Sequence, residues 1–141
     1  MIAELRLITS DSDIADCFDA FSALRPHLRR EEFLSRVKLQ QSQSYQILAV
    51  AVEGQYPSAA GFRIQNFLAW GTVLYIDDLT TMPQARGRGY ASQLLEWLID
   101  HAKIQRCHAV HLDTGYGRHE AHKLYLKMGF RLRSHHMALE L

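Results

Sequence analysis

The stretch TVLYIDDLTTMPQARGRGYASQLLEWLIDHAK, residues 72–103, decides the fold of this chain. Its first part, 72–81, is rich in apolar and β-branched residues and predicts a strand. Pro83 then interrupts the strand, and Gly87 and Gly89 mark a short loop. Beyond the loop, apolar residues recur at three and four positions, as on one face of a helix: Ala91, Leu94, Leu95, Leu98 and Ala102. The stretch therefore predicts a strand, a glycine-containing loop and a helix in succession.

The remaining elements follow from periodicity and turn residues on either side of this stretch. Toward the amino terminus we expect a strand, two helices and two further strands at 2–8, 14–24, 30–41, 45–52 and 61–65, with turns at Glu53-Gly54 and Pro57-Ser58. Toward the carboxyl terminus we expect a strand, a helix ending at Gly129, and a last strand broken near Ser134, at 109–112, 118–128 and 130–141. This order predicts a mixed α/β domain.

Composition suits one soluble domain, residues 1–141. The chain has 141 residues, of which 48% are hydrophobic, so it can form one core but not two. Sixteen basic residues oppose fifteen acidic ones, so no net field attracts nucleic acid, and any anion site must be local. The amino terminus has no signal peptide pattern and no stretch reaches membrane-spanning length, which predicts a cytoplasmic protein that does not contact a membrane.

Cys17 and Cys107 lack the spacing of a metal site or of a disulfide framework, and we expect two buried, reduced thiols. Eight histidines include His119 and His122, one helical turn apart, and the pair His135-His136. No H-E-x-x-H or paired-cysteine motif accompanies them, so we expect no metal site.

The loop at 84–89 has the features of an anion site. Glycine lets the backbone approach a ligand closely, and the amino terminus of the following helix offers unpaired N–H groups and partial positive charge. Arg86 and Arg88 add full charges beside it. The residues after Gly89 fit neither a P-loop nor a dinucleotide-binding fingerprint. An ordinary strand-to-helix turn with exposed arginines is the alternative.

Two motifs together resemble the GNAT N-acetyltransferase superfamily. The run from Thr81 to Ala91, followed by Leu94-Leu95, is similar to the family's acetyl-CoA-binding motif. The run AHKLYLKMGF, residues 121–130, is similar to its later motif, in which an alanine and a tyrosine precede Gly-Phe. The resemblance implies a GNAT-like single domain of the α/β (mixed α+β) class. Its central sheet would be mixed but mostly antiparallel, flanked by helices, with two parallel strands splayed to admit the cofactor.

The resemblance also implies where acetyl-CoA, the cosubstrate, binds. The backbone of Leu79 and Thr81 would bond the pantetheine arm, and the amides from Arg86 to Tyr90 would hold the pyrophosphate. The full set of expected cofactor-binding residues is Leu79, Thr80, Thr81, Gln84, Arg86, Gly87, Arg88, Gly89, Tyr90, Ala91, Arg118 and Tyr125. Many family members have an asparagine that contacts the cofactor where this chain has Arg118.

Tyr125 is the candidate general acid, because the matching tyrosine of the family lies near the thioester sulfur and a phenol is protonated at neutral pH. The alternative is that its ring only packs along the helix. Asp77 is the candidate base or water-positioning group, while water itself can also remove the proton. Alternation along the strand puts Asp77 and Asp78 on opposite faces, so at most one should point directly into a substrate cleft.

The charge of Asp77 and Asp78 is expected to favour a cationic acceptor, and both residues, with His111, are candidates for binding it. The acceptor would be an amine of a small molecule or a peptide. A sensor that binds acyl-CoA without catalysis and a nucleic-acid binder using Arg86, Arg88 and Arg118 are the alternative functions. The sequence identifies neither the amine nor the oligomeric state, and it is compatible with a homodimer.

Overall fold

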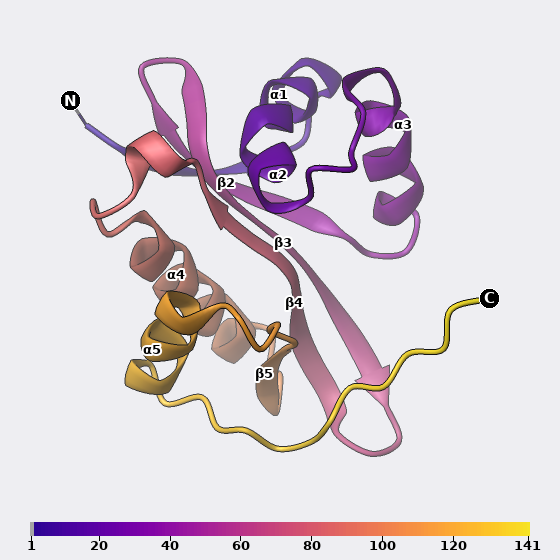
Figure 1. Ribbon diagram of the computed structural model, residues 1–141. Helices are drawn as coiled ribbons and strands as arrows, with labels where there is room; N and C mark the ends of the chain where they lie inside the picture. Colours follow the sequence, from indigo (N-terminus) through magenta and orange to yellow (C-terminus); the bar gives the residue numbers. More distant parts are fainter. Residues whose placement is uncertain (1) are drawn as a thin grey trace. The chain divides into compact units, whose positions relative to one another are not determined.

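The computed structural model describes residues 2–141 and contains a five-stranded sheet in the order β1-β2-β3-β4-β5. The chain divides into two compact units, Met1–His111 and Leu112–Leu141. The first four strands, which are joined in antiparallel pairs, are β1 (Glu4–Ile8), β2 (Gln46–Val52), β3 (Gln55–Phe67) and β4 (Gly71–Thr81). The short strand β5 (Ala109–Leu112) lies beside β4 (Figure 1). This sheet with its helices confirms the predicted mixed α/β fold.

Three helices, α1 (Asp11–Asp16), α2 (Phe18–Leu24) and α3 (Arg30–Gln41), lie together beside the sheet of the first unit (Figure 1). Where one helix was expected at 14–24, the chain turns at Cys17, whose amide bonds the Ile14 carbonyl at 3.0 Å. Such an i to i+3 bond tightens the turn and ends α1. The side chains on both sides of the turn are buried, including Ile14, Cys17, Phe18, Ala20 and Phe21.

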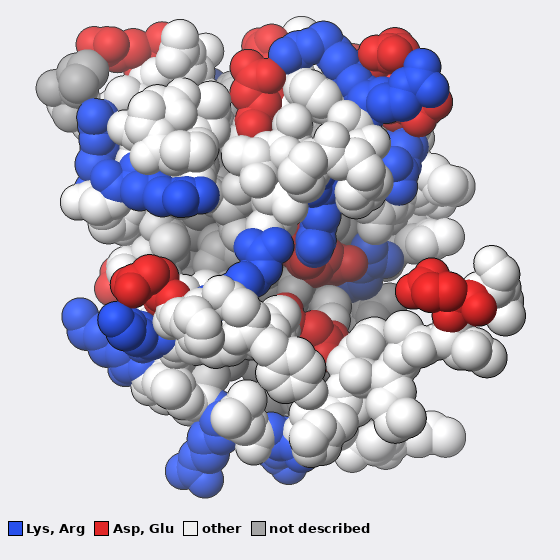
Figure 2. Space-filling view, in the orientation of Figure 1, with Lys and Arg blue, Asp and Glu red and all other residues white. Residues whose placement is uncertain are grey.

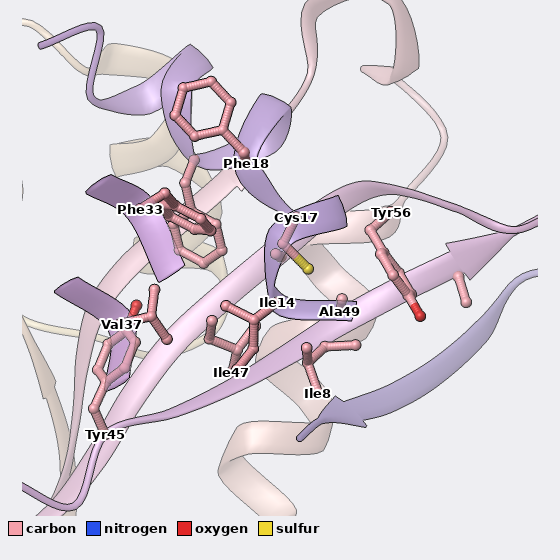
Figure 3. Packing of buried hydrophobic residues seen from close by; sticks show 13 residues of the cluster. Ile8, Ile14, Cys17, Phe18, Phe33, Val37, Tyr45, Ile47, Ala49 and Tyr56 are labelled. Carbon is pink, nitrogen blue, oxygen red and sulfur yellow. The ribbon is translucent and has the colours of Figure 1, made fainter. Parts of the chain in front are cut away.

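The core of the first unit forms where these helices meet β2 and β3. Phe18, Phe33 and Val37 of the helices belong to one buried cluster with Ile47 and Ala49 of β2. Figure 3 shows Phe33 and Val37 close to Ile47. The ring of Phe18 meets that of Phe33 edge to face, with ring centres 5.4 Å apart. This cluster fixes the position of α2 and α3 relative to the strands that they cover.

Pro57 does not end a strand, as was expected, but lies inside β3. The register between β2 and β3 shifts between Val50 and Val52, where Pro57 stands opposite. Proline has no backbone N–H to donate to the neighbouring strand. At a register shift one residue is left out of the ladder of hydrogen bonds, so proline is tolerated there. Its carbonyl accepts from the Met82 amide at 2.8 Å.

The helix α4 (Tyr90–Ile104) follows the single turn η1 (Pro83–Ala85) and buries Leu94, Leu95, Leu98 and Ala102, as the periodicity predicted. The helix α5 (His119–Lys127) belongs to the second unit, and Gly129 beyond it has φ +99°, as a C-terminal cap requires. Cys17 is fully buried and Cys107 only half-buried, and both are free. Among residues 2–141 no helix is long and apolar enough to cross a membrane.

The strand expected at 130–141 does not form. The segment has no regular secondary structure, and its apolar side chains are exposed, including Leu132, Met137 and Leu139. A strand is stable only when its backbone N–H and C=O groups form hydrogen bonds with a neighbouring strand. An alternating pattern of side chains does not by itself provide such a neighbour.

Candidate functional site

The loop between β4 and α4 has a backbone that only glycine adopts without strain. Gly87 has φ +78° and Gly89 φ +79°, and no atom lies within 4 Å of a Cβ added at either position. The glycines are therefore required by the backbone conformation and not by crowding. The space around them is open on the side where a side chain would stand.

The amino terminus of α4 offers unpaired amides beside this loop. The Gln93 amide donates to the Gly89 carbonyl at 3.1 Å, so the amides of Tyr90, Ala91 and Ser92 have no acceptor within the helix. Arg86 and Arg88 are exposed next to them. Amides, helix dipole and arginines together make a local site suited to a diphosphate.

The end of β4 leads directly into this loop, and its threonine side chains are already used by the fold. The Thr80 hydroxyl donates to the Ala20 carbonyl at 2.8 Å, and the Thr81 hydroxyl shares a 2.8 Å hydrogen bond with Ser58. The His108 amide at the start of β5 bonds the Thr72 carbonyl at 2.7 Å, so the end of β4 extends past the short strand β5. A ligand beside Leu79 and Thr81 would therefore meet backbone groups, not hydroxyls.

A β-bulge at Asp77 changes the alternation along β4. Gly61 of β3 pairs with Asp78, and the next residue, Phe62, pairs with Ile76, so Asp77 is the extra residue. The expectation that Asp77 and Asp78 are separated on opposite faces is wrong for this reason. The bulge allows both carboxylates to enter one network of polar side chains.

Each carboxylate in this network is paired with an arginine. Arg63 donates from Nε and Nη2 to the two oxygens of Asp77 at 3.0 and 2.9 Å. Asp78 accepts from Arg25 Nε at 3.1 Å and from the Tyr45 hydroxyl at 2.7 Å. Arg25 also donates from Nη2 to the backbone carbonyl of Asp77 at 3.0 Å. The two acids therefore do not form the unpaired negative patch that would favour a cationic acceptor.

Burial changes the proton affinity of this network. It raises the pKa of Asp77, while hydrogen bonds and charge from Arg63 act in the opposite direction. The pKa of Tyr45 lies well above its usual range, because the phenol is buried and faces the charge of Asp78. Tyr45 is therefore a neutral donor, and burial moves the pKa of Asp77 toward neutrality.

Tyr45, Arg25 and Arg63 are the residues that sequence reasoning missed. Tyr45 reaches Asp78 by crossing Gly61, where an added Cβ would lie 1.7 Å from the Tyr45 hydroxyl. A glycine inside a strand indicates a bulge or a close approach of another group, and here it marks both. That glycine was the available signal for the network.

Tyr125 and Arg118 lie in the second unit, Leu112–Leu141, on α5 and at its amino-terminal cap. Tyr125 is half-buried, and its ring centre lies 5.7 Å from that of Phe130. Burial raises the pKa of Tyr125, and the charge of Arg118 acts against this rise. The phenol therefore stays protonated at neutral pH, as a general acid must.

The expected acceptor residue His111 packs its ring against Trp70, with ring centres 4.3 Å apart. His119 and His122 lie 6.1 Å apart between ring centres, and the His122 ring bonds the Gly115 carbonyl at 2.9 Å. Across residues 2–141 no group of three or more His, Cys, Asp or Glu side chains is placed to hold a metal ion.

Comparison with known proteins connects this geometry to a family. The model of the acetyltransferase (GNAT) family matches residues 13–130. The N-acetyltransferase YhdJ of Bacillus subtilis, which is described as uncharacterized, is 30% identical over 133 residues, covering 93% of this chain and 94% of that protein.

Solved structures share the fold. An acetyltransferase of Trypanosoma brucei superimposes with a TM-score of 0.83 at 24% identity, covering 99% of this chain and 100% of that one. The aminoglycoside N-acetyltransferase AAC(6')-Iy in complex with CoA gives 0.85 at 15% identity, covering 99% of this chain and 95% of that one. With a family model over most of its length and a relative matched nearly end to end, the chain belongs to the acetyltransferase (GNAT) family.

Proposed function

We infer that this acetyl-CoA-dependent N-acetyltransferase transfers the acetyl group to a primary amine of a small molecule or peptide, with Tyr125 as general acid. The observation that carries the proposal is the loop at Gly87 and Gly89, where open space, unpaired helix amides and two exposed arginines coincide. That combination suits the pyrophosphate of acetyl-CoA. Backbone groups of Leu79 and Thr81 would hold the pantetheine arm, and Gln84 and Arg118 would add polar contacts.

The reaction is a direct transfer. The neutral amine nitrogen attacks the thioester carbonyl carbon, a C–N bond forms and the C–S bond breaks. The departing thiolate takes the proton of the Tyr125 hydroxyl, which solvent then replaces. Because burial raises the pKa of Tyr125, the phenol is protonated at neutral pH and has a proton to donate.

The proton of the attacking amine leaves to water or to Asp77. Asp77 is the candidate base, because burial raises its pKa. Its side chain is also the more accessible of the two, at 23% exposed against 13% for Asp78. Both of its oxygens already accept from Arg63, so only their remaining lone pairs can take a proton or orient a water molecule. Asp78, held by Arg25 and Tyr45, serves to fix the bulge.

The test combines binding with turnover. Acetyl-CoA should raise the melting temperature of the protein, because a ligand that binds only the native state stabilises it. Incubation with acetyl-CoA and a panel of primary amines should release free CoA thiol, measured with a chromogenic disulfide. A protein stabilised by acetyl-CoA that releases no thiol with any amine would instead be the non-catalytic sensor.

The variant Tyr125→Phe separates the acid role from packing, since it keeps the ring and removes only the hydroxyl. We expect kcat to fall by about 10²- to 10⁴-fold, the usual contribution of a general acid, with the affinity for acetyl-CoA unchanged. Tyr116→Phe is a matched control, because that tyrosine is exposed and lies outside the proposed chemistry. An unchanged kcat in Tyr125→Phe would refute the assignment.

A further inference from the structure

Arg25 is held in one orientation at the bulge of β4. It stands at the C-terminal cap of α2, and its Nε and Nη2 groups bond the Asp78 carboxylate at 3.1 Å and the Asp77 carbonyl at 3.0 Å. Two attachment points fix a planar guanidinium, so little rotamer freedom is left to lose when it binds a third group. Its Nη1 donates to no acceptor in residues 2–141 and remains available.

Arg25 is the most exposed charged side chain of the network that it forms with Arg63, Asp77 and Asp78. The side chain of Arg25 is 40% exposed, whereas Arg63 is 10%, Asp78 13% and Asp77 23% exposed. The formal charges of the four groups cancel, but a ligand approaching from solvent meets positive charge before negative. The network therefore repels a second cationic group on the acceptor and attracts an anionic one.

Neighbouring charges do not reverse this arrangement. Asp19 of α2 is paired with Arg30 at 2.6 Å, and Glu31 of α3 is paired with Arg29 at 3.0 Å. In Figure 2, groups of both signs lie side by side in the region of these helices. The acids nearest to Arg25 along the chain are thus neutralised by arginines of their own.

We propose that the acceptor is an amine that also carries an oxyanion, such as a carboxylate, phosphate or phosphonate, and that Arg25 binds this oxyanion through Nη1. A guanidinium offers such groups short, charge-assisted hydrogen bonds in a fixed plane. Arg25 is then a specificity-determining residue. This inference rests on the proposed acetyl transfer and names the class of amine that the same site takes.

The test compares amines of matched length: β-alanine and 2-aminoethylphosphonate with an oxyanion, propylamine with none, and 1,3-diaminopropane with a second cation. For the wild-type protein we expect kcat/KM for the first two to exceed that for propylamine by about tenfold or more, the factor that corresponds to ~1.4 kcal/mol. The diamine should be the poorest acceptor. A preference for propylamine or for the diamine would overturn the inference without any variant.

The variant Arg25→Gln should remove the preference by raising KM for the oxyanion amines about tenfold or more, with propylamine little changed. Damage to the fold or to Asp78 would instead lower the rate for every amine alike. Arg29→Gln is the matched control, since it removes a charge from the same connection between α2 and α3 and should keep the preference. A preference that survives in Arg25→Gln would refute the role of Arg25.

The outcome also separates this inference from the proposed function. Stabilisation by acetyl-CoA together with acetylation of propylamine, but no advantage for the oxyanion amines, would overturn only the acceptor class. Absence of both stabilisation and thiol release would overturn the acetyl transfer on which it rests.

Discussion

Gly61 shows how a single residue sets the geometry of the candidate site. The absence of a side chain lets the Tyr45 hydroxyl cross β3 and donate to Asp78 at 2.7 Å. Opposite this residue the register of β4 shifts, which makes Asp77 the bulged residue. The ring of Tyr45 also lies 5.3 Å from the guanidinium of Arg63, which pairs with Asp77. The missing side chain of Gly61 therefore permits the contact between Tyr45 and Asp78.

Gly61→Ala is expected to disrupt this arrangement. An added Cβ would lie 1.7 Å from the Tyr45 hydroxyl and 2.3 Å from its ring carbon Cζ, so the buried ring must move and its bond to Asp78 must break. Overpacking of this kind costs about 1–3 kcal/mol of unfolding free energy, measured by urea denaturation. The rate of acetyl transfer should fall as well, because the bulge loses a contact.

Gly117→Ala provides the comparison. No atom lies within 4 Å of a Cβ at Gly117, and we expect its unfolding free energy to change by less than about 1 kcal/mol. If Gly61→Ala proved as stable as the wild type, the Tyr45 hydroxyl could not lie against Gly61 as it does in this structure.

At the scale of elements, the connection from β4 to α4 has a backbone with positive φ at the place where acetyl-CoA is proposed to bind. Gly89 stands at the amino-terminal cap of α4 without any side-chain cap, and its φ of +79° turns the chain into the helix. In most helices a serine, threonine or aspartate side chain occupies the first free amides. Here no side chain caps those amides, and the proposed function assigns them to the diphosphate of acetyl-CoA.

Gly89→Ala should weaken acetyl-CoA binding beyond its effect on stability. An alanine with positive φ costs about 1–2 kcal/mol, and it also places a methyl group in the open space beside the amides. Gly54, in the turn between β2 and β3, has φ +75° and equally open surroundings, so Gly54→Ala imposes a similar strain away from the loop. We expect both variants to lose similar stability and only Gly89→Ala to lose affinity by titration calorimetry. Equal affinities would exclude the loop from the cofactor site.

The elements that sequence predicted well are those whose signals are local. The periodicity of α3 and α4, the apolar and β-branched residues of β4 and the glycine beyond α5 act within a few residues, and each of these elements formed where it was expected. The prediction that Asp77 and Asp78 are separated on opposite faces of β4 is wrong because the bulge depends on how β4 pairs with β3. The sequence of β4 alone does not determine that register. The network of Tyr45 and Arg25 joins residues far apart in the chain, and only the folded structure brings them together.

At the scale of the whole molecule, the proposed site residues are divided between the two units. The loop and the acidic pair belong to Met1–His111, and Tyr125 with Arg118 belongs to Leu112–Leu141. The two motifs that resemble the family therefore come from different units. Under the proposed function, the loop at Gly87 and Gly89 supplies cofactor binding and Tyr125 supplies the acid.

Acetyl-CoA should therefore slow amide hydrogen exchange in both units. If the proposed function is right, amides at 87–92 should be protected by the pyrophosphate, and amides of α5 should be protected by contacts of Tyr125 and Arg118 with acetyl-CoA. Mass spectrometry of peptides from the free and saturated protein measures both segments in one experiment, and peptides from α3 serve as the internal control. Protection at the loop without any at α5 would leave the cofactor site intact but would remove Tyr125 as its acid, since a residue that donates to the thiolate must lie against the bound thioester.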